Sequence, residues 1–205
     1  MGLLEDTMIH LTLDFEIGDG PDDGDDDGAQ ALSRDATRDT APAPQRKRDL
    51  QMQKQQQSNW CWAATTISIL RFYESSSTMT QCQLVNKHFG RSDCCSSPSS
   101  SNCNQGSNTG DALKLVGHLR EDRAGALAFK DVQTEIAGGR PIVVKIVWSG
   151  GGAHAIAIDG YASSTNANWV YGDDPWTGNS FVYDYNSFKT SYGGSGSWDR
   201  SRLTK

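Results

Sequence analysis

The 205-residue chain lacks several features that would place it in a membrane or on a nucleic acid. It has no apolar run that approaches ~18 residues, the length that suggests a transmembrane helix. Its first residues contain no basic start and no continuous apolar core, so no secretory signal peptide is recognisable. Lysine and arginine are absent from residues 1–29 and scattered elsewhere, without the clustered basic face of nucleic-acid-binding proteins. Composition therefore predicts a protein that binds neither membranes nor nucleic acids.

The acidic charge is concentrated in the first part of the chain. The formal charge is −6, from 25 acidic and 19 basic residues, and residues 1–29 contribute ten of the acids and no Lys or Arg. The remainder, with 15 acids against 19 bases, is about +4. Residues 18–49 are rich in Asp, Gly, Pro and Ala, which is typical of a disordered linker. We therefore expect residues 1–49 to be an acidic, largely disordered pro-segment or secretion region, and residues 50–205 to be the folded domain.

The cysteines are few and unevenly placed. Cys61 stands alone, whereas the other four lie within 22 residues: Cys82, Cys94, Cys95 and Cys103. This arrangement predicts two disulfides and one free thiol. A bond between the vicinal pair would be strained, so Cys82 and Cys103 should each take one of Cys94 and Cys95, in an order that the sequence leaves open. Free thiols or a zinc site are the alternatives, but the paired C-x₂-C spacing of zinc sites is missing. Disulfides imply an oxidising destination, so we expect a secreted or exported protein.

Helical and strand patterns occupy different parts of the domain. Apolar periodicity and capping patterns predict helices over residues 60–73, 78–88, 110–120 and 131–137. Apolar and β-branched runs then predict strands over residues 141–148, 154–161, 169–171 and 180–185. Helices first and strands afterwards indicate an α+β fold in which the two halves pack against each other.

Three residues could form a catalytic group. Cys61 lies at the predicted start of the first helix, and a helix N-terminus and a nearby imidazolium both favour the nucleophilic thiolate form of a cysteine. His154 lies on a strand after three consecutive glycines. Asp174 follows the next strand, where its carboxylate could accept the second ring N–H of the histidine and orient the ring. The helical half would then present a nucleophile, and the strand half a base, across a cleft.

Acyl transfer also needs hydrogen-bond donors for the oxyanion of the tetrahedral intermediate. The backbone N–H of Cys61 is one candidate. A side-chain amide just upstream is the natural second, and Gln55 lies six residues before the nucleophile. Gln56 and Gln57 are alternatives for the same task.

Several segments resemble papain-like cysteine peptidases. One is the run Asn59-Trp60-Cys61-Trp62-Ala63-Ala64 with its upstream glutamines; the others are residues 80–85, 103–106, 139–144, 154–161 and 173–176. The bacterial branch is the most similar: staphopain-like enzymes, effector proteases of plant pathogens and peptidases that remove double-glycine leaders. The resemblance spans about residues 50–190. It implies a papain-like fold with the active-site cleft between the helical and the β half.

The resemblance also implies roles for the residues that match. Cys61 would be the nucleophile, His154 the general base and acid, Asp174 the orienting residue and Gln55 the oxyanion amide. The reaction would be endopeptidase hydrolysis of a protein or peptide through a thioester acyl-enzyme. No metal or cofactor is expected, and we expect a monomer.

Two other functions fit the same residues. A Cys-His-Asp triad also serves transglutaminases and amidases, which transfer the acyl group to another acceptor. A papain-like scaffold could also be an inactive binding module.

Composition changes abruptly at Arg46-Lys47-Arg48, so we expect the N-terminal region to be removed before or during activation.

Overall fold

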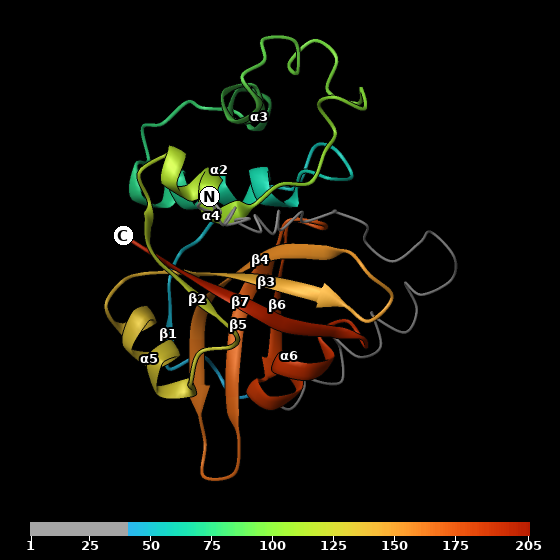
Figure 1. Ribbon diagram of the computed structural model, residues 1–205. Helices are drawn as coiled ribbons and strands as arrows, with labels where there is room; N and C mark the ends of the chain where they lie inside the picture. Colours follow the sequence, from blue (N-terminus) through green and yellow to red (C-terminus); the bar gives the residue numbers. More distant parts are fainter. Residues whose placement is uncertain (1–40) are drawn as a thin grey trace, which may run out of the picture.

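The helical and strand-rich parts of the chain form two layers (Figure 1). A computed structural model describes residues 41–205. The predicted N-terminal region thus lies outside the described residues, apart from residues 41–49. The elements are β1 (Arg46–Lys47), α2 (Cys61–Tyr73), α3 (Gln81–Phe89), α4 (Thr109–Leu115), β2 (Leu119–Ala124), α5 (Phe129–Ala137), β3 (Ile142–Trp148), β4 (Ala153–Ser163), β5 (Asn168–Asp174), β6 (Asn179–Asp184), α6 (Tyr185–Ser191) and β7 (Gly196–Thr204).

Helix α2 is the central element of the helical layer. Residues 61–70 are all buried, because α2 contacts α3, α4 and strand β4 on its different sides. A helix without a polar face belongs in a core. Across the described residues, no helix combines the length and the apolar character that crossing a membrane would take. The predicted first helix and the α+β class are both confirmed.

Helix α3 begins later than predicted. Its N-cap is Thr80, whose side chain accepts a hydrogen bond from the backbone N–H of Gln83, while the Gln83 side chain accepts one from the Thr80 N–H. This reciprocal pair is a capping box. The box therefore starts at residue 80 and not at residue 78.

Helix α4 is shorter than predicted, and a strand follows it. The helix ends at Leu115, and Gly117 adopts a φ of 84°, a conformation that glycine tolerates and other residues rarely adopt. The chain then turns into β2, where a continuation of the helix to residue 120 was expected. That expectation was wrong, because the pattern of apolar residues does not show that the backbone changes direction at Gly117.

The strands among the described residues form one antiparallel sheet in the order β2-β7-β3-β4-β5-β6. Strands β3 to β6 correspond to the four predicted strands. Strands β2 and β7 and helix α6 were not predicted. The sequence of β2 is mostly charged, and β7 lies between β2 and β3 through pairing with residues far away in the chain. Helices α5 and α6 cover the sheet away from the helical layer and share its largest apolar cluster.

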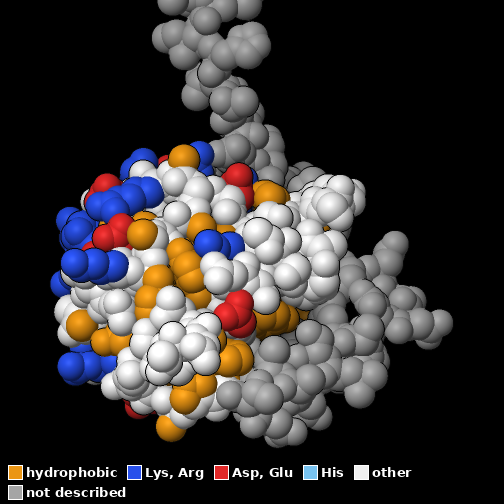
Figure 2. All heavy atoms as spheres, turned by 90° about the horizontal axis from the view of Figure 1, so that it is seen from below, with side chains coloured by type: hydrophobic (Ala, Val, Ile, Leu, Met, Phe, Trp, Pro, Cys, Tyr) orange, Lys and Arg blue, Asp and Glu red, His pale blue; other side chains and the backbone are white. Residues whose placement is uncertain are grey.

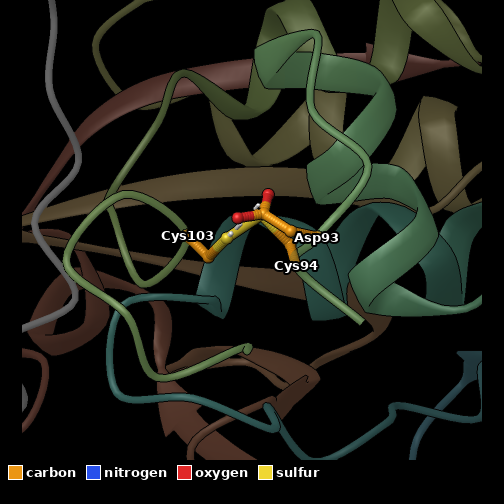
Figure 3. A group of neighbouring side chains, drawn as sticks. All are labelled: Asp93, Cys94 and Cys103. Atoms are coloured by element: carbon orange, nitrogen blue, oxygen red, sulfur yellow. Dashed lines mark hydrogen bonds between the residues drawn. A yellow bond between two sulfur atoms is a disulfide. The ribbon is translucent and has the colours of Figure 1, made fainter. Parts of the chain in front are cut away.

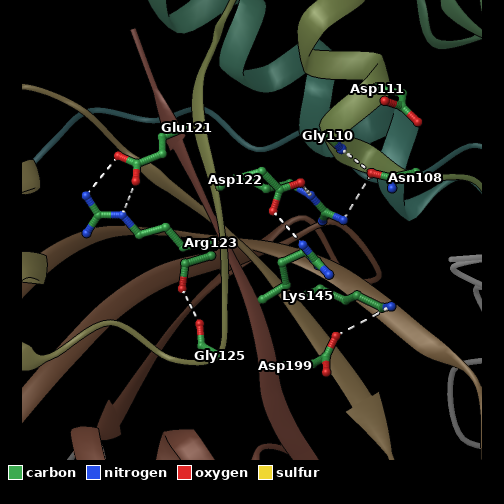
Figure 4. A network of polar contacts seen from close by, with 12 residues as sticks. Asn108, Gly110, Asp111, Glu121, Asp122, Arg123, Gly125, Lys145 and Asp199 are labelled. Atoms are coloured by element: carbon green, nitrogen blue, oxygen red, sulfur yellow. Dashed lines mark hydrogen bonds and ion pairs between the residues drawn. The ribbon is translucent and has the colours of Figure 1, made fainter. Parts of the chain in front are cut away.

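A polar network joins the start of α4 to the sheet (Figure 4). Asn108 caps α4 by accepting a hydrogen bond from the Gly110 N–H at 2.8 Å, and it also accepts one from Arg202 of β7 at 3.2 Å. Asp122 of β2 pairs with Arg200 at 3.2 Å and lies 3.7 Å from Arg202. A Cβ at position 110 would lie 2.8 Å from the Asp122 carboxylate, so a larger residue there would displace the polar side chains of this junction.

The face opposite the helical layer carries charges of both signs (Figure 2). Lys and Arg side chains gather along one edge, with acidic side chains between them, while apolar side chains are exposed over the middle. Among the described residues, Arg120 and Arg140 pair with Glu135, and Arg123 pairs with Glu121. The three arginines thus share two carboxylates, which leaves one positive charge unbalanced among them.

The last residues of the predicted linker pack onto the sheet. Strand β1 pairs with β4 at Arg46–Tyr161 and Lys47–Gly160, just beyond the end of the β3 pairing at Ile142. The guanidinium of Arg48 donates to the carbonyls of Ile136 and Ala137 at the end of α5. The boundary between residues 49 and 50 stays a prediction, but a cut within residues 46–48 would remove these contacts.

Strand β1 also supplies the countercharge of two buried carboxylates. Lys47 Nζ lies 2.7 Å from Asp159 Oδ2 on β4 and 3.9 Å from Asp173 Oδ2 on β5. Burial and the neighbouring Asp173 raise the pKa of Asp159 to about 7, and Lys47 acts in the opposite direction. The folded state therefore binds a proton at Asp159 between about pH 4 and pH 7 that the unfolded state releases, so this group lowers stability as pH rises through that window.

The Lys47→Met variant should be destabilised by about 1–3 kcal/mol at neutral to alkaline pH, because it leaves the Asp159 carboxylate buried without its countercharge. The deficit should shrink as pH falls below about 7, where Asp159 is protonated. Thermal unfolding of both proteins at about pH 5.5 and about pH 8.5 measures this difference. Adding Asp159→Asn should largely restore stability. A deficit that is independent of pH would contradict the ion-pair explanation.

Candidate active site

The ends of two neighbouring strands bring His154 and Asp174 together. His154 is the second residue of β4, Asp174 is the last residue of β5, and the two strands are paired. The Nε2 atom of His154 lies 2.7 Å from Oδ1 of Asp174, and the two side chains are only 5% and 6% exposed. The sequence-predicted pair is therefore in direct contact in a place from which water is almost excluded.

Cys61 lies at the first position of α2, on the other side of His154. The N-cap residue Trp60 makes no side-chain capping hydrogen bond. One turn later, the Thr65 hydroxyl donates to the Ala155 carbonyl of β4 at 3.0 Å and ties the start of α2 to the strand that carries His154. Cys61 is among the groups that raise the pKa of His154, so the two side chains are close together. Because Nε2 of the ring faces Asp174, Nδ1 is the nitrogen that remains for the sulfur.

The electrostatics of this group favour a charged histidine. Burial opposes the imidazolium, but the Asp174 carboxylate and the contact with Cys61 outweigh burial and raise the pKa of His154 to about 10. Burial likewise opposes the Asp174 carboxylate. The charge and hydrogen bond of His154, the Tyr192 hydroxyl and the Trp176 N–H outweigh it and hold the pKa of Asp174 at about 2. At neutral pH the pair is thus an imidazolium and a carboxylate.

A cavity of about 450 Å³ adjoins the site. It is lined by Lys54, Gln55, Gln56, Gln57, Ser58 and Trp176. The backbone N–H of Gln55 donates to the Pro175 carbonyl at 2.7 Å, and Gln81 at the start of α3 bonds to the backbone of Lys54 and Gln56. The cavity therefore lies between a loop of the helical half and the turn that follows Asp174, as expected for a cleft between the halves.

The side chain of Gln55 faces its own loop. Its amide Nε2 donates to the carbonyls of Gln57 at 2.9 Å and Ser58 at 2.7 Å, while Oε1 is buried without a hydrogen-bond partner. Gln56 is exposed and Gln57 is partly buried. To stabilise an oxyanion, the Gln55 amide would have to exchange one of these carbonyls for the substrate oxygen.

Comparison with known families identifies the chain. The family model described as "Papain-like cysteine protease AvrRpt2" matches residues 44–193, about three quarters of the sequence. The chain belongs to this family. It is therefore a papain-like cysteine protease, as the resemblance predicted, and the match begins just before strand β1.

One solved structure of a bacterial protein is similar to the protease over most of its length but at low sequence identity. The Pseudomonas avirulence protein AvrPphB aligns with 82% of this chain and 99% of its own, at 15% identity and a TM-score of 0.36. A likeness at this level supports no inference about function. None of the curated proteins compared with the protease matches it.

Both predicted disulfides of the protease involve the loop between α3 and α4: one ties it to α3, and the other closes it on itself. Cys82 pairs with Cys95 and Cys94 pairs with Cys103, which resolves the order that the sequence left open, and Cys61 is free. Among the described residues, the candidate metal-binding group is Asp93 with Cys94 and Cys103 (Figure 3). Because its two sulfur atoms are bonded to each other, they cannot serve as thiolate ligands, and the structure favours disulfides over zinc.

This disulfide-bonded loop holds the residues on both sides of Cys61. The indole N–H of Trp60 donates to the Cys103 carbonyl at 2.8 Å, and that of Trp62 donates to the Gln105 carbonyl at 2.9 Å. The Asn104 side chain accepts from the Asn59 backbone N–H at 2.9 Å. The covalent cross-links therefore support the backbone that carries the free thiol.

We expect the double variant Cys94→Ser/Cys103→Ser to lose about 2–4 kcal/mol of stability and part of its kcat, because the carbonyl that holds Trp60 is no longer tethered. The matched variant Cys82→Ser/Cys95→Ser keeps the Cys94–Cys103 bond, so its kcat per folded molecule should fall less. Thermal unfolding and active-site titration measure the two effects separately. Equal kcat in both variants and in the parent protein would show that the loop contributes only to stability.

Proposed function

We propose that the protease is an endopeptidase that works through Cys61, His154 and Asp174. The observation that supports this most strongly is the buried His154–Asp174 contact of 2.7 Å beside the one free thiol of the chain. Such a pair places the imidazole beside a sulfur at a helix N-terminus that has no side-chain cap, the surroundings in which reactive cysteines are found. The residue types and their contacts are those that nucleophilic acyl transfer needs.

The proposed reaction has two stages. The Cys61 thiolate attacks the carbonyl carbon of the scissile peptide bond, and the oxyanion that forms accepts hydrogen bonds from the Cys61 N–H and the Gln55 amide. The tetrahedral intermediate collapses to a thioester as His154 gives its proton to the leaving amine. His154 then takes a proton from water, which attacks the thioester and releases the carboxylic acid and the thiolate. Asp174 keeps the imidazole in one orientation throughout.

The destination of the protein is part of the proposal. Two disulfides in the helical half support export to an oxidising environment. Protein or peptide chains are the proposed substrates, and the protein is proposed to act as a monomer without a cofactor. If the N-terminal region is removed as proposed, the contacts of residues 42–48 argue for a cut before Pro42, whose carbonyl accepts a hydrogen bond from the Tyr171 hydroxyl of β5.

The central test is the Cys61→Ala variant. It should lose all measurable hydrolysis of a peptide library while it remains folded, because no second free thiol exists to replace Cys61. An epoxysuccinyl inhibitor should label the parent protein at Cys61 alone. Retained hydrolysis in the variant, with labelling elsewhere, would refute the proposal.

The acceptor of the acyl group can be identified in the same experiment. Incubation with a glutamine-containing protein and a primary amine should create new peptide termini without incorporating the amine. Amine incorporation would instead support a transglutaminase-like activity. A folded parent protein whose Cys61 resists the inhibitor and which cleaves nothing would point to a binding module.

The Gln55→Ala variant tests the oxyanion assignment. Loss of one oxyanion donor should reduce kcat by about 10²–10³-fold and change KM little, because the donor acts mainly on the transition state. Gln56→Ala is the matched control: Gln56 lines the same cavity but its side chain is exposed, so kcat should stay within about threefold of the parent value. If Gln57→Ala shows the large loss and Gln55→Ala does not, the donor is Gln57.

A further inference from the structure

Asp174 has a second side-chain partner, Tyr192. The Tyr192 hydroxyl donates to Oδ2 of Asp174 at 2.5 Å. The other oxygen, Oδ1, accepts from His154 Nε2 at 2.7 Å and from the Trp176 backbone N–H at 2.8 Å. Donors on both oxygens prevent the carboxylate from rotating about its last torsion. The plane of the carboxylate, and with it the direction of the bond to His154, is thereby fixed.

Tyr192 is itself held rigidly. It follows the last residue of α6, and its backbone N–H and carbonyl bond to Gly196 at 2.9 and 2.8 Å, which closes a tight turn. A Cβ at position 196 would lie 2.5 Å from Ile146 and 2.7 Å from Trp148, so the turn has no room for a residue larger than glycine. These backbone contacts fix the position of residue 192, and with it the place from which its hydroxyl reaches Asp174.

The ring of Tyr192 lies in an aromatic cluster and is only 2% exposed. Its neighbours are Trp148, Phe181, Tyr183 and Phe188, with centroids 5.2 to 6.1 Å away. A phenylalanine would fill the same space and make the same ring contacts. Packing therefore accounts for the ring but not for the hydroxyl, whose contact with Asp174 needs a separate explanation.

We propose that Tyr192 is a positioning residue of the protease, whose hydroxyl keeps Asp174 oriented so that the His154 ring presents Nδ1 to Cys61. This rests on the proposed roles of Cys61, His154 and Asp174. A buried carboxylate is stable only when its oxygens are hydrogen-bonded. Without the hydroxyl, Oδ2 would face aromatic rings, and Asp174 would take up a proton or turn away from the histidine.

The Tyr192→Phe variant tests the proposal, with Tyr183→Phe as the matched control. Tyr183 is in the same cluster and is 5% exposed. Its hydroxyl accepts a hydrogen bond from the Gly193 N–H, whereas that of Tyr192 donates to Asp174. Each variant thus removes one buried hydroxyl and keeps the ring. The readouts are kcat, KM and the rate at which iodoacetamide alkylates Cys61, all measured against pH.

For Tyr192→Phe we expect kcat to fall about 10- to 100-fold with KM nearly unchanged, as for loss of a hydrogen bond to a charged group. The hydroxyl helps to keep the pKa of Asp174 low, so its loss should raise that pKa. The acid limbs of the pH profiles of kcat and of the alkylation rate should then move to higher pH. Tyr183→Phe should leave the profiles in place and kcat within about twofold. In an Asp174→Asn background, Tyr192→Phe should have almost no further effect, because its target carboxylate is gone.

Equal kcat and equal pH profiles for the two tyrosine variants would overturn the positioning role, as would an undiminished effect of Tyr192→Phe in the Asp174→Asn background. Failure of the underlying triad has a different signature. In that case Asp174→Asn or Cys61→Ala would by itself leave the parent activity intact, whatever the tyrosine variants do.

Discussion

The buried contact between His154 and Asp174 is the interaction on which the site depends. Two opposite charges are kept almost out of water at 2.7 Å, an arrangement that is stable only if the remaining hydrogen-bonding capacity of both groups is used. The Trp176 N–H and the Tyr192 hydroxyl donate the other hydrogen bonds to the carboxylate, and Cys61 is the group near the imidazole that also raises its pKa. The same contact determines the chemistry of the ring, because Nε2 is occupied and Nδ1 is left for the sulfur.

The two layers of the fold make different contributions to this site. The sheet places His154 and Asp174 on paired strands, where the antiparallel register fixes their separation. The helical layer presents Cys61 at the start of a buried helix, tied to β4 by Thr65 and held from behind by the disulfide-bonded loop. The site is therefore precise only if the layers are held together, and the Thr65 hydrogen bond and the polar network at α4 both serve that purpose.

Sequence patterns predicted helices and strands correctly where the burial of a residue follows from its neighbours in sequence. The apolar runs of α2 and of β3 to β6 could be predicted, since their burial is continuous along the chain. Strand β2 could not, because charged residues form it and its partner β7 is about 80 positions away. The basic triplet at residues 46–48 suggested a processing junction, yet in the folded protein it belongs to a strand and to the countercharge of Asp159.

The sequence by itself determined the class of protein, a papain-like cysteine protease, because the segments around Cys61 and His154 resemble that family in residue type, order and flanking pattern. It also predicted two disulfides among the four clustered cysteines, which the structure contains. Tertiary structure alone decided which cysteines pair, which way the Gln55 amide faces, and that Tyr192 touches Asp174. These depend on the relative placement of segments distant in the chain, and that placement arises from long-range strand pairing and packing, which leave no local trace in the order of the residues.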